Sequence, residues 1–131
     1  MKKKTKILLG IYLAVWLAVI AFFWMVFRSD DALFFSLVMT TVTPIMTAIL
    51  SYNAGRNEGV AIKAGTVVFT GIMFMLQPFL TFDLLNSLTF HHANYPEPLV
   101  ALMGAVISAV FIMIGSLRAR KLNSTKTNTE N

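Results

Sequence analysis

The chain has 131 residues, of which 56% are hydrophobic and 13% charged, and it contains no cysteine. Soluble domains are about half apolar and a quarter charged, so this composition excludes an ordinary soluble fold. The lack of cysteine excludes disulfides, thiolate metal sites and thiol nucleophiles, and the net charge of +5 calls for no nucleic-acid partner, because the cations follow a membrane topology.

The apolar residues form four long blocks, and the charged residues lie between the blocks. A helix needs about 20 largely apolar residues to cross a hydrocarbon core of about 30 Å. The first block, residues 7–27, has no charged residue and is longer than the core of about 7–15 residues in a signal peptide, so we expect a retained anchor. The other blocks cover residues 32–51, 64–82 and 98–117. The sequence therefore predicts an all-α membrane protein, a bundle of four transmembrane helices over residues 7–117.

The lysines and arginines are concentrated in alternate segments between these blocks. Only Arg28 lies in the second or fourth connecting segment, and the other ten of the 11 cations lie in the first, third and fifth. Cations in short loops stay in the cytoplasm, so we expect an up-down topology with both termini cytoplasmic, in the cell membrane of a bacterium. Residues 1–6 then form a basic cytoplasmic N-terminus. Residues 118–131 form a basic, polar tail without apolar periodicity, which predicts disorder.

Small or polar side chains follow one face of each predicted helix, because residues three or four positions apart share a face. In the first helix these residues are Gly10, Ala14, Ala18 and Ala21. In the other helices they include Ser36, Thr40, Thr43, Thr47, Thr66, Thr70, Gln77 and Ser108. Close approach over small residues and interhelical hydrogen bonds hold helices together inside a bilayer, so packing is the favoured interpretation. The alternative is that the hydroxyl stripes of the second and third helices line a hydrated path.

Two prolines, Pro44 and Pro78, lie inside the second and third blocks. Each removes a backbone hydrogen bond, so we expect each to kink its helix. Thr40 and Thr41 lie one turn before Pro44, where a hydroxyl can satisfy a carbonyl that the proline frees.

The connection over residues 83–97 holds the one polar cluster, in which His91 and His92 lie between two acidic residues. Imidazole and carboxylate groups together can bind a metal or sense pH. Adjacent histidines point in different directions, however, so metal binding by His91 and His92 is the weaker interpretation. Before them, Leu84, Leu85 and Leu88 predict a short amphipathic segment on the outer membrane surface.

The sequence offers no arrangement for catalysis. It has no nucleophile elbow, zinc-protease motif or phosphate-binding glycine loop, and no charged residue lies in the middle of a block, where transporters carry coupling groups. Lys63 lies at a block end and is expected to reach water. We therefore expect neither enzyme activity nor a cofactor. The leading hypothesis is an accessory or homo-oligomeric membrane component that binds itself or another membrane protein in the bilayer. The alternatives are a small oligomeric permease or channel, and an external metal or pH sensor.

Overall fold

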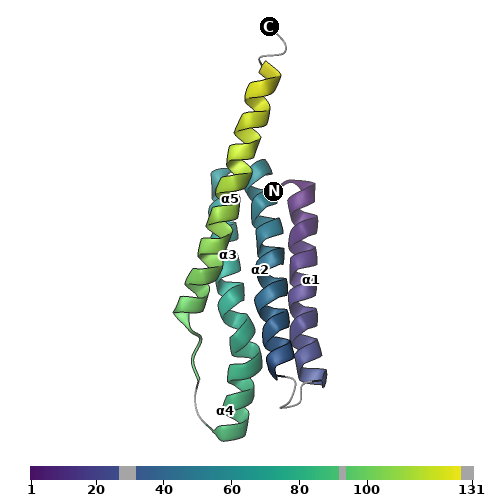
Figure 1. Ribbon diagram of the computed structural model, residues 1–131, viewed down its shortest axis with the longest axis vertical. Coiled ribbons are helices and arrows are strands. Elements are labelled where there is room, and N and C mark those ends of the chain that lie inside the picture. The colour runs from purple at the N-terminus through teal and green to yellow at the C-terminus, as the bar shows by residue number, and fades with distance from the viewer. Residues whose placement is uncertain (27–31, 92–93, 128–131) are drawn as a thin grey trace.

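The computed structural model describes residues 1–26, 32–91 and 94–127. Within them the elements are α1 (Lys3–Val26), α2 (Ala32–Asn57), α3 (Val60–Pro78), the π-helical turn η2 (Phe79–Asp83), α4 (Leu84–Phe90) and α5 (Pro98–Thr127). Figure 1 shows the long helices side by side, with the start of α1 and the end of α5 toward the same end of the bundle. We call this the terminal end and the opposite one the α4 end. Four helical rods of the described residues are long and apolar enough to cross a membrane, which confirms the predicted all-helical class and the predicted number of helices that could span. Arg28, the one cation that the predicted topology places on the outer side, lies outside the described residues.

The helices extend past the predicted blocks at the terminal end. α1 already begins at Lys3, α2 continues to Asn57, and α5 continues to Thr127. The prediction of a disordered tail over residues 118–131 is therefore corrected for residues 118–127, and the remaining four residues lie outside the described part. Adding a residue to an existing helix is far easier than starting one, and the lysine, arginine and leucine that follow the last block are good helix formers.

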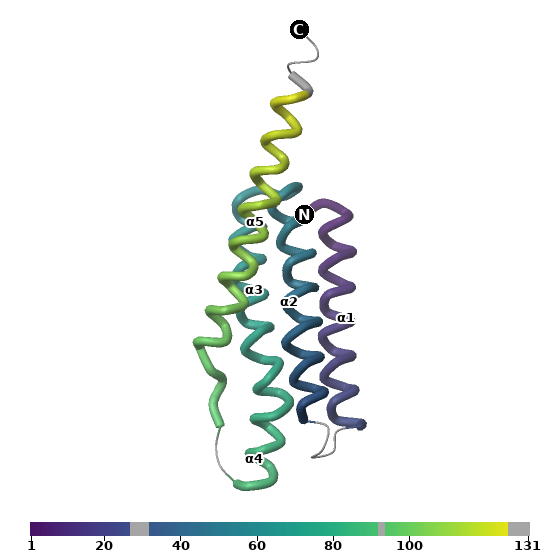
Figure 2. The backbone as a smooth tube through the Cα atoms, in the orientation of Figure 1, coloured from purple at the N-terminus to yellow at the C-terminus, as the bar shows by residue number. Residues whose placement is uncertain are grey.

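α3, η2 and α4 form one continuous rod, which Figure 2 shows as a single tube. Pro78 has no N–H to continue the α-helical ladder, and the next turn is wider, with the backbone N–H of Leu84 reaching the carbonyl of Phe79. The hydroxyl of Thr81 donates to the carbonyls of Gln77 (2.8 Å) and Pro78 (3.2 Å) within this turn. The expected amphipathic surface segment is thus the last part of the rod, because the π-helical turn keeps the chain helical past the proline.

α2 stays helical through Pro44. The hydroxyl of Thr40 donates to the carbonyls of Ser36 (2.8 Å) and Leu37 (3.3 Å). These carbonyls lie one turn before the carbonyl that Pro44 leaves without a donor. The hydroxyl of Thr40 therefore does not provide the expected compensation.

α5 packs against α2 and α3, and α1 packs mainly against α2. Glycines allow these contacts. A Cβ on Gly71 of α3 would lie 2.9 Å from the carbonyl oxygen of Ala101, and one on Gly104 of α5 would lie 2.6 Å from the ring of Phe74. Small residues on α3 and α5 therefore allow these two helices to approach closely, as small residues do at helix contacts in membranes.

α1 turns its aromatic face, not its small face, toward the bundle. Tyr12, Trp16 and Phe23 are buried, and the indole N–H of Trp16 donates to the carbonyl of Met73 at 3.1 Å. Gly10 and Ala14, in contrast, are exposed, and a Cβ on Gly10 would meet no atom within 4 Å. The expectation that the small face of this helix packs within the chain is corrected, because the rings bury more surface and one also bonds a backbone carbonyl.

Candidate functional site

A crevice of about 370 Å³ lies between α2, α3 and α5. In Figure 1 the start of α5 leans away from α3 on the side of the bundle nearer α4. Most of the crevice wall is apolar, and its polar atoms come from the predicted stripes of α2 and α3. The lining includes Ser36, Thr40, Thr43, Phe74, Gln77, Val100, Met103 and Ile107.

Gln77 is the distinctive residue of this crevice. Its side chain is only 3% exposed, and its Oε1 accepts a hydrogen bond from the hydroxyl of Thr43. Its Nε2 has no hydrogen-bond partner. Among the described residues it is the one buried side-chain nitrogen or oxygen that lacks a partner. A buried amide N–H without an acceptor is costly, and hydrocarbon offers no water to supply one. The crevice therefore contains a hydrogen-bond donor that requires an acceptor.

Two further polar side chains lie at the exposed edge of the crevice. Ser36 and Thr40 are both exposed, and the hydroxyl of Thr40 is held by the backbone of its own helix. Such back-bonding lowers the cost of facing lipid, while the oxygen lone pairs remain available to a neighbour. The crevice thus presents hydroxyls at its edge and an amide donor at its base.

The remaining stripe residues lie between helices and bond within the chain. The hydroxyls of Ser51 and Ser108 are 2.7 Å apart and join α2 to α5, and the hydroxyl of Thr47 donates to that of Tyr12 at 3.4 Å. Thr70 is fully buried and donates to the carbonyl of Thr66 at 2.8 Å. Thr66 in turn donates to the carbonyl of Ile62 at 2.8 Å. These contacts are those of packed helices, and they occupy the interior where a path along the stripes would have to run.

A polar relay that the sequence did not reveal joins three helices at the terminal end. The ammonium of Lys63 donates to the hydroxyl of Ser116 at 2.8 Å, and that hydroxyl donates to the carbonyl of Gly55 at 2.9 Å. Lys63 was expected to reach water, but its partner lies on α5. The spacing within one helix gives no signal for a partner 53 positions away.

A second polar group fixes the start of α1 to the turn between α2 and α3. The amide of Asn53 donates to the hydroxyl of Thr5 at 2.9 Å, and the backbone N–H of Lys2 donates to the carboxylate of Glu58 at 2.7 Å. The hydrogen bond from Thr5, followed by that from Lys2 and the nearby positive charges, holds the pKa of Glu58 below its ordinary value of 4.5. The charged carboxylate is thus the form that stabilises this corner.

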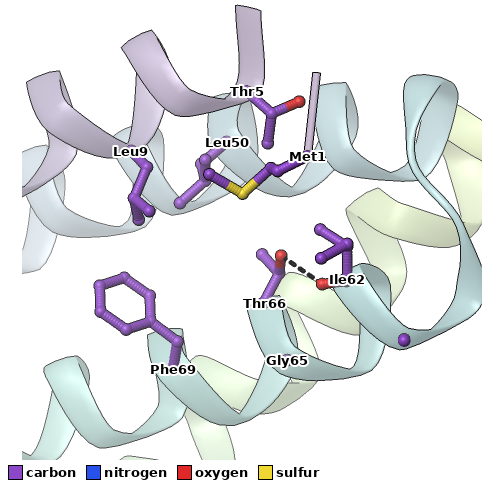
Figure 3. A pocket seen from close by; sticks show the side chains of 9 residues that line it. Met1, Thr5, Leu9, Leu50, Ile62, Gly65, Thr66 and Phe69 are labelled. Carbon is purple, nitrogen blue, oxygen red and sulfur yellow. Dashed lines mark hydrogen bonds between the residues drawn. The ribbon is translucent and has the colours of Figure 1, made fainter. Parts of the chain in front are cut away.

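A smaller pocket of about 240 Å³ lies between α1 and α3 near this corner. Figure 3 shows the side chain of Met1 lying across it, with Leu9 and Phe69 on its walls. The hydroxyls of Thr5 and Thr66 also line it, but both already bond within the chain. The pocket is therefore an apolar gap between packed helices rather than a site with unused polar groups.

No known protein family, curated protein or solved structure matches this chain. The function is therefore inferred from the chemistry of the chain's own residues.

His91 ends α4 in a left-handed backbone conformation (φ 55°), and its side chain is exposed. His92 lies outside the described residues, so the predicted pair cannot be placed as a unit. The described residues contain no group of three or more histidine or acidic side chains that could hold a metal ion. Metal binding by His91 and His92 stays a prediction.

Proposed function

We propose that the protein is a non-catalytic component of a bacterial cell membrane that binds another transmembrane helix at the crevice between α2, α3 and α5. It acts either as an accessory subunit of a partner protein or as a homo-oligomer. The unpartnered Nε2 of Gln77 carries this proposal, because it is a buried donor at the base of an opening formed by three spanning helices.

The depth of Gln77 favours a helix over a lipid headgroup as the source of the acceptor. Gln77 lies six positions before Asp83, the first charged residue after the third block, which is about 9 Å along a helix. The ester oxygens of lipids lie at the edge of the hydrocarbon, whereas a spanning helix can present a hydroxyl or amide oxygen at any depth. Hydrogen bonds of this kind, together with close packing, are what joins helices in bilayers.

The proposed topology is up-down with both termini in the cytoplasm. The distribution of lysine and arginine supports it, and the start of α1 and the end of α5 lie toward the same end of the bundle. Partners would then approach laterally within the membrane.

Cysteine crosslinking in native membranes tests the proposed contact, because the chain has no cysteine of its own. We expect Thr40→Cys, at the edge of the crevice, to crosslink through a short bis-maleimide to a neighbouring chain. The matched control is Leu17→Cys on α1, because Leu17 is 58% exposed and does not line the crevice. Adding Gln77→Leu to the Thr40→Cys variant should reduce the crosslinked fraction several-fold, since the donor is removed while side-chain bulk is largely kept.

The size and composition of the adduct separate the two forms of the proposal. A product of twice the 14.6 kDa mass that contains only this chain shows a homo-oligomer, whereas a second, defined polypeptide shows an accessory subunit. Equal crosslinking from Leu17→Cys, or no effect of Gln77→Leu, would reject the crevice as the contact.

A further inference from the structure

A second groove, of about 420 Å³, lies between α1, α2 and α5 at the terminal end. It shares no lining residue with the crevice around Gln77. Its walls are apolar, with Leu8 from α1, Ile49 from α2 and Phe111 from α5 among them. Its volume lies within the range of about 300–1,000 Å³ that is typical of small-molecule pockets.

Two cations, Lys4 and Arg56, also line this groove, one from each side. Both are exposed, and over residues 1–26, 32–91 and 94–127 neither forms an ion pair or a side-chain hydrogen bond. The described acidic residue nearest in sequence to Arg56 is Glu58, whose carboxylate accepts the backbone N–H of Lys2 instead. The groove thus combines apolar walls with positive charge that the chain itself does not neutralise.

The position of these cations matches that of a lipid phosphate. Lys4 precedes the first apolar block, and Arg56 follows the second, so both lie where the hydrocarbon ends, while the apolar walls lie at the depth of acyl chains. Tyr52, which also lines the groove, is a residue type favoured at this interface. Basic sites between transmembrane helices are suited to anionic lipid headgroups.

We propose that this groove binds one anionic phospholipid, with its phosphate between Lys4 and Arg56 and an acyl chain along the apolar wall. The site requires both parts of the ligand: the charge for the two cations and the chain for the groove. It does not depend on the crevice or its partner.

Native mass spectrometry of the full chain in detergent, titrated with phosphatidylglycerol, measures the apparent Kd of the first bound lipid. Replacing both cations, in Lys4→Gln/Arg56→Gln, should weaken this Kd by about fivefold for each cation lost. The matched control Arg120→Gln/Lys121→Gln removes the same charge from the exposed end of α5 and should change the Kd less than twofold. Phosphatidylcholine should bind the original chain and both variants alike.

A substitution that keeps the charge tests the acyl part of the site. Ala48→Phe fills the groove, which Ala48 lines, and should also weaken phosphatidylglycerol binding several-fold. Ala14→Phe on the exposed face of α1 should not. Glycerol 3-phosphate, which lacks acyl chains, should fail to displace the lipid at equal concentration.

Three results would overturn the proposal. The first is an unchanged Kd in Lys4→Gln/Arg56→Gln, and the second is an equal loss in the α5 control, which would show only a general effect of charge. The third is full displacement by glycerol 3-phosphate, which would assign the site to free phosphate. None of these results bears on crosslinking at the crevice, so the two proposals fail separately.

Discussion

The contact between α2 and α5 at Gly55 gives a sharp test of the packing. In Gly55→Ala the added Cβ would lie 2.7 Å from the Cα of Ile112, and closer still to the carbonyl oxygen of that residue. Ordinary contact begins at 3.4 Å, so the two helices must separate by at least about 0.7 Å at this point. Because the obstacle is backbone, no side-chain rotation relieves it.

One turn along both helices, this separation acts on the hydrogen bond between Ser51 and Ser108. Their hydroxyls are 2.7 Å apart, and a shift of at least this size would take them to about 3.4 Å or more, beyond the usual O–H···O range of about 2.5–3.0 Å. Overpacking costs about 1–3 kcal/mol, and an interhelical hydrogen bond in a membrane contributes about 0.6–2 kcal/mol. We therefore expect Gly55→Ala to lower the free energy of unfolding by about 2–4 kcal/mol.

The assay is reversible unfolding in mixed micelles with increasing sodium dodecyl sulfate, followed by far-ultraviolet circular dichroism. Gly65→Ala is the matched control, because a Cβ on Gly65 would meet no atom within 4 Å. In the control, alanine should leave stability unchanged or raise it by up to about 1 kcal/mol through its better helix propensity. If Gly55→Ala were as stable as Gly65→Ala, the close approach of α2 and α5 would be refuted.

Two further predictions concern the interior stripe and the corner at Glu58. Thr47→Leu and Thr70→Leu each place a larger side chain at a fully buried position, so we expect a loss of about 1–3 kcal/mol in the same unfolding assay. Liposomes containing the original chain should show no solute flux, and a specific flux abolished by either change would favour a permease instead. Because the pKa of Glu58 is lowered on folding, its contribution to stability is complete above its ordinary value of 4.5 and is lost as the pH falls through the lowered folded value. The stability difference between the original chain and Glu58→Gln should therefore shrink between pH 7 and pH 3, and a difference independent of pH would contradict the assigned hydrogen bonds.

The number of helices long and apolar enough to span could be predicted from the sequence because it depends on local composition alone. The limits of the helices could not, because hydrophobicity marks where the hydrocarbon ends, whereas a helix continues until something stops it. α5 continues past Leu117 through basic residues for this reason.

The predicted stripes coincide with the buried faces of α3 and α5 and with that of α2 from Thr43 onward, but Ser36 and Thr40 of α2 are exposed and the small face of α1 is not buried. The periodicity placed Ser108 on a polar or small face, and the structure joins it to Ser51 of α2, but a spacing within one helix does not identify a partner on another. In α1 two faces could have packed, one small and one aromatic. The choice depended on Trp16 reaching a carbonyl of α3, a contact that exists only once the helices are assembled. The unpaired amide of Gln77 is also a property of the assembly, since its neighbours come from three helices.

Single cysteines labelled from outside intact cells test the proposed topology, on which the cellular side of every surface depends. Tyr95 is 79% exposed in the connection before α5, and Val60, the first residue of α3, is 83% exposed. We expect a membrane-impermeant maleimide to label Tyr95→Cys on intact cells, and Val60→Cys and Ser124→Cys only after the membrane is opened. Labelling of Val60→Cys and Ser124→Cys on intact cells, with Tyr95→Cys protected, would reverse the orientation. Equal labelling of all three positions would contradict the four-span account itself.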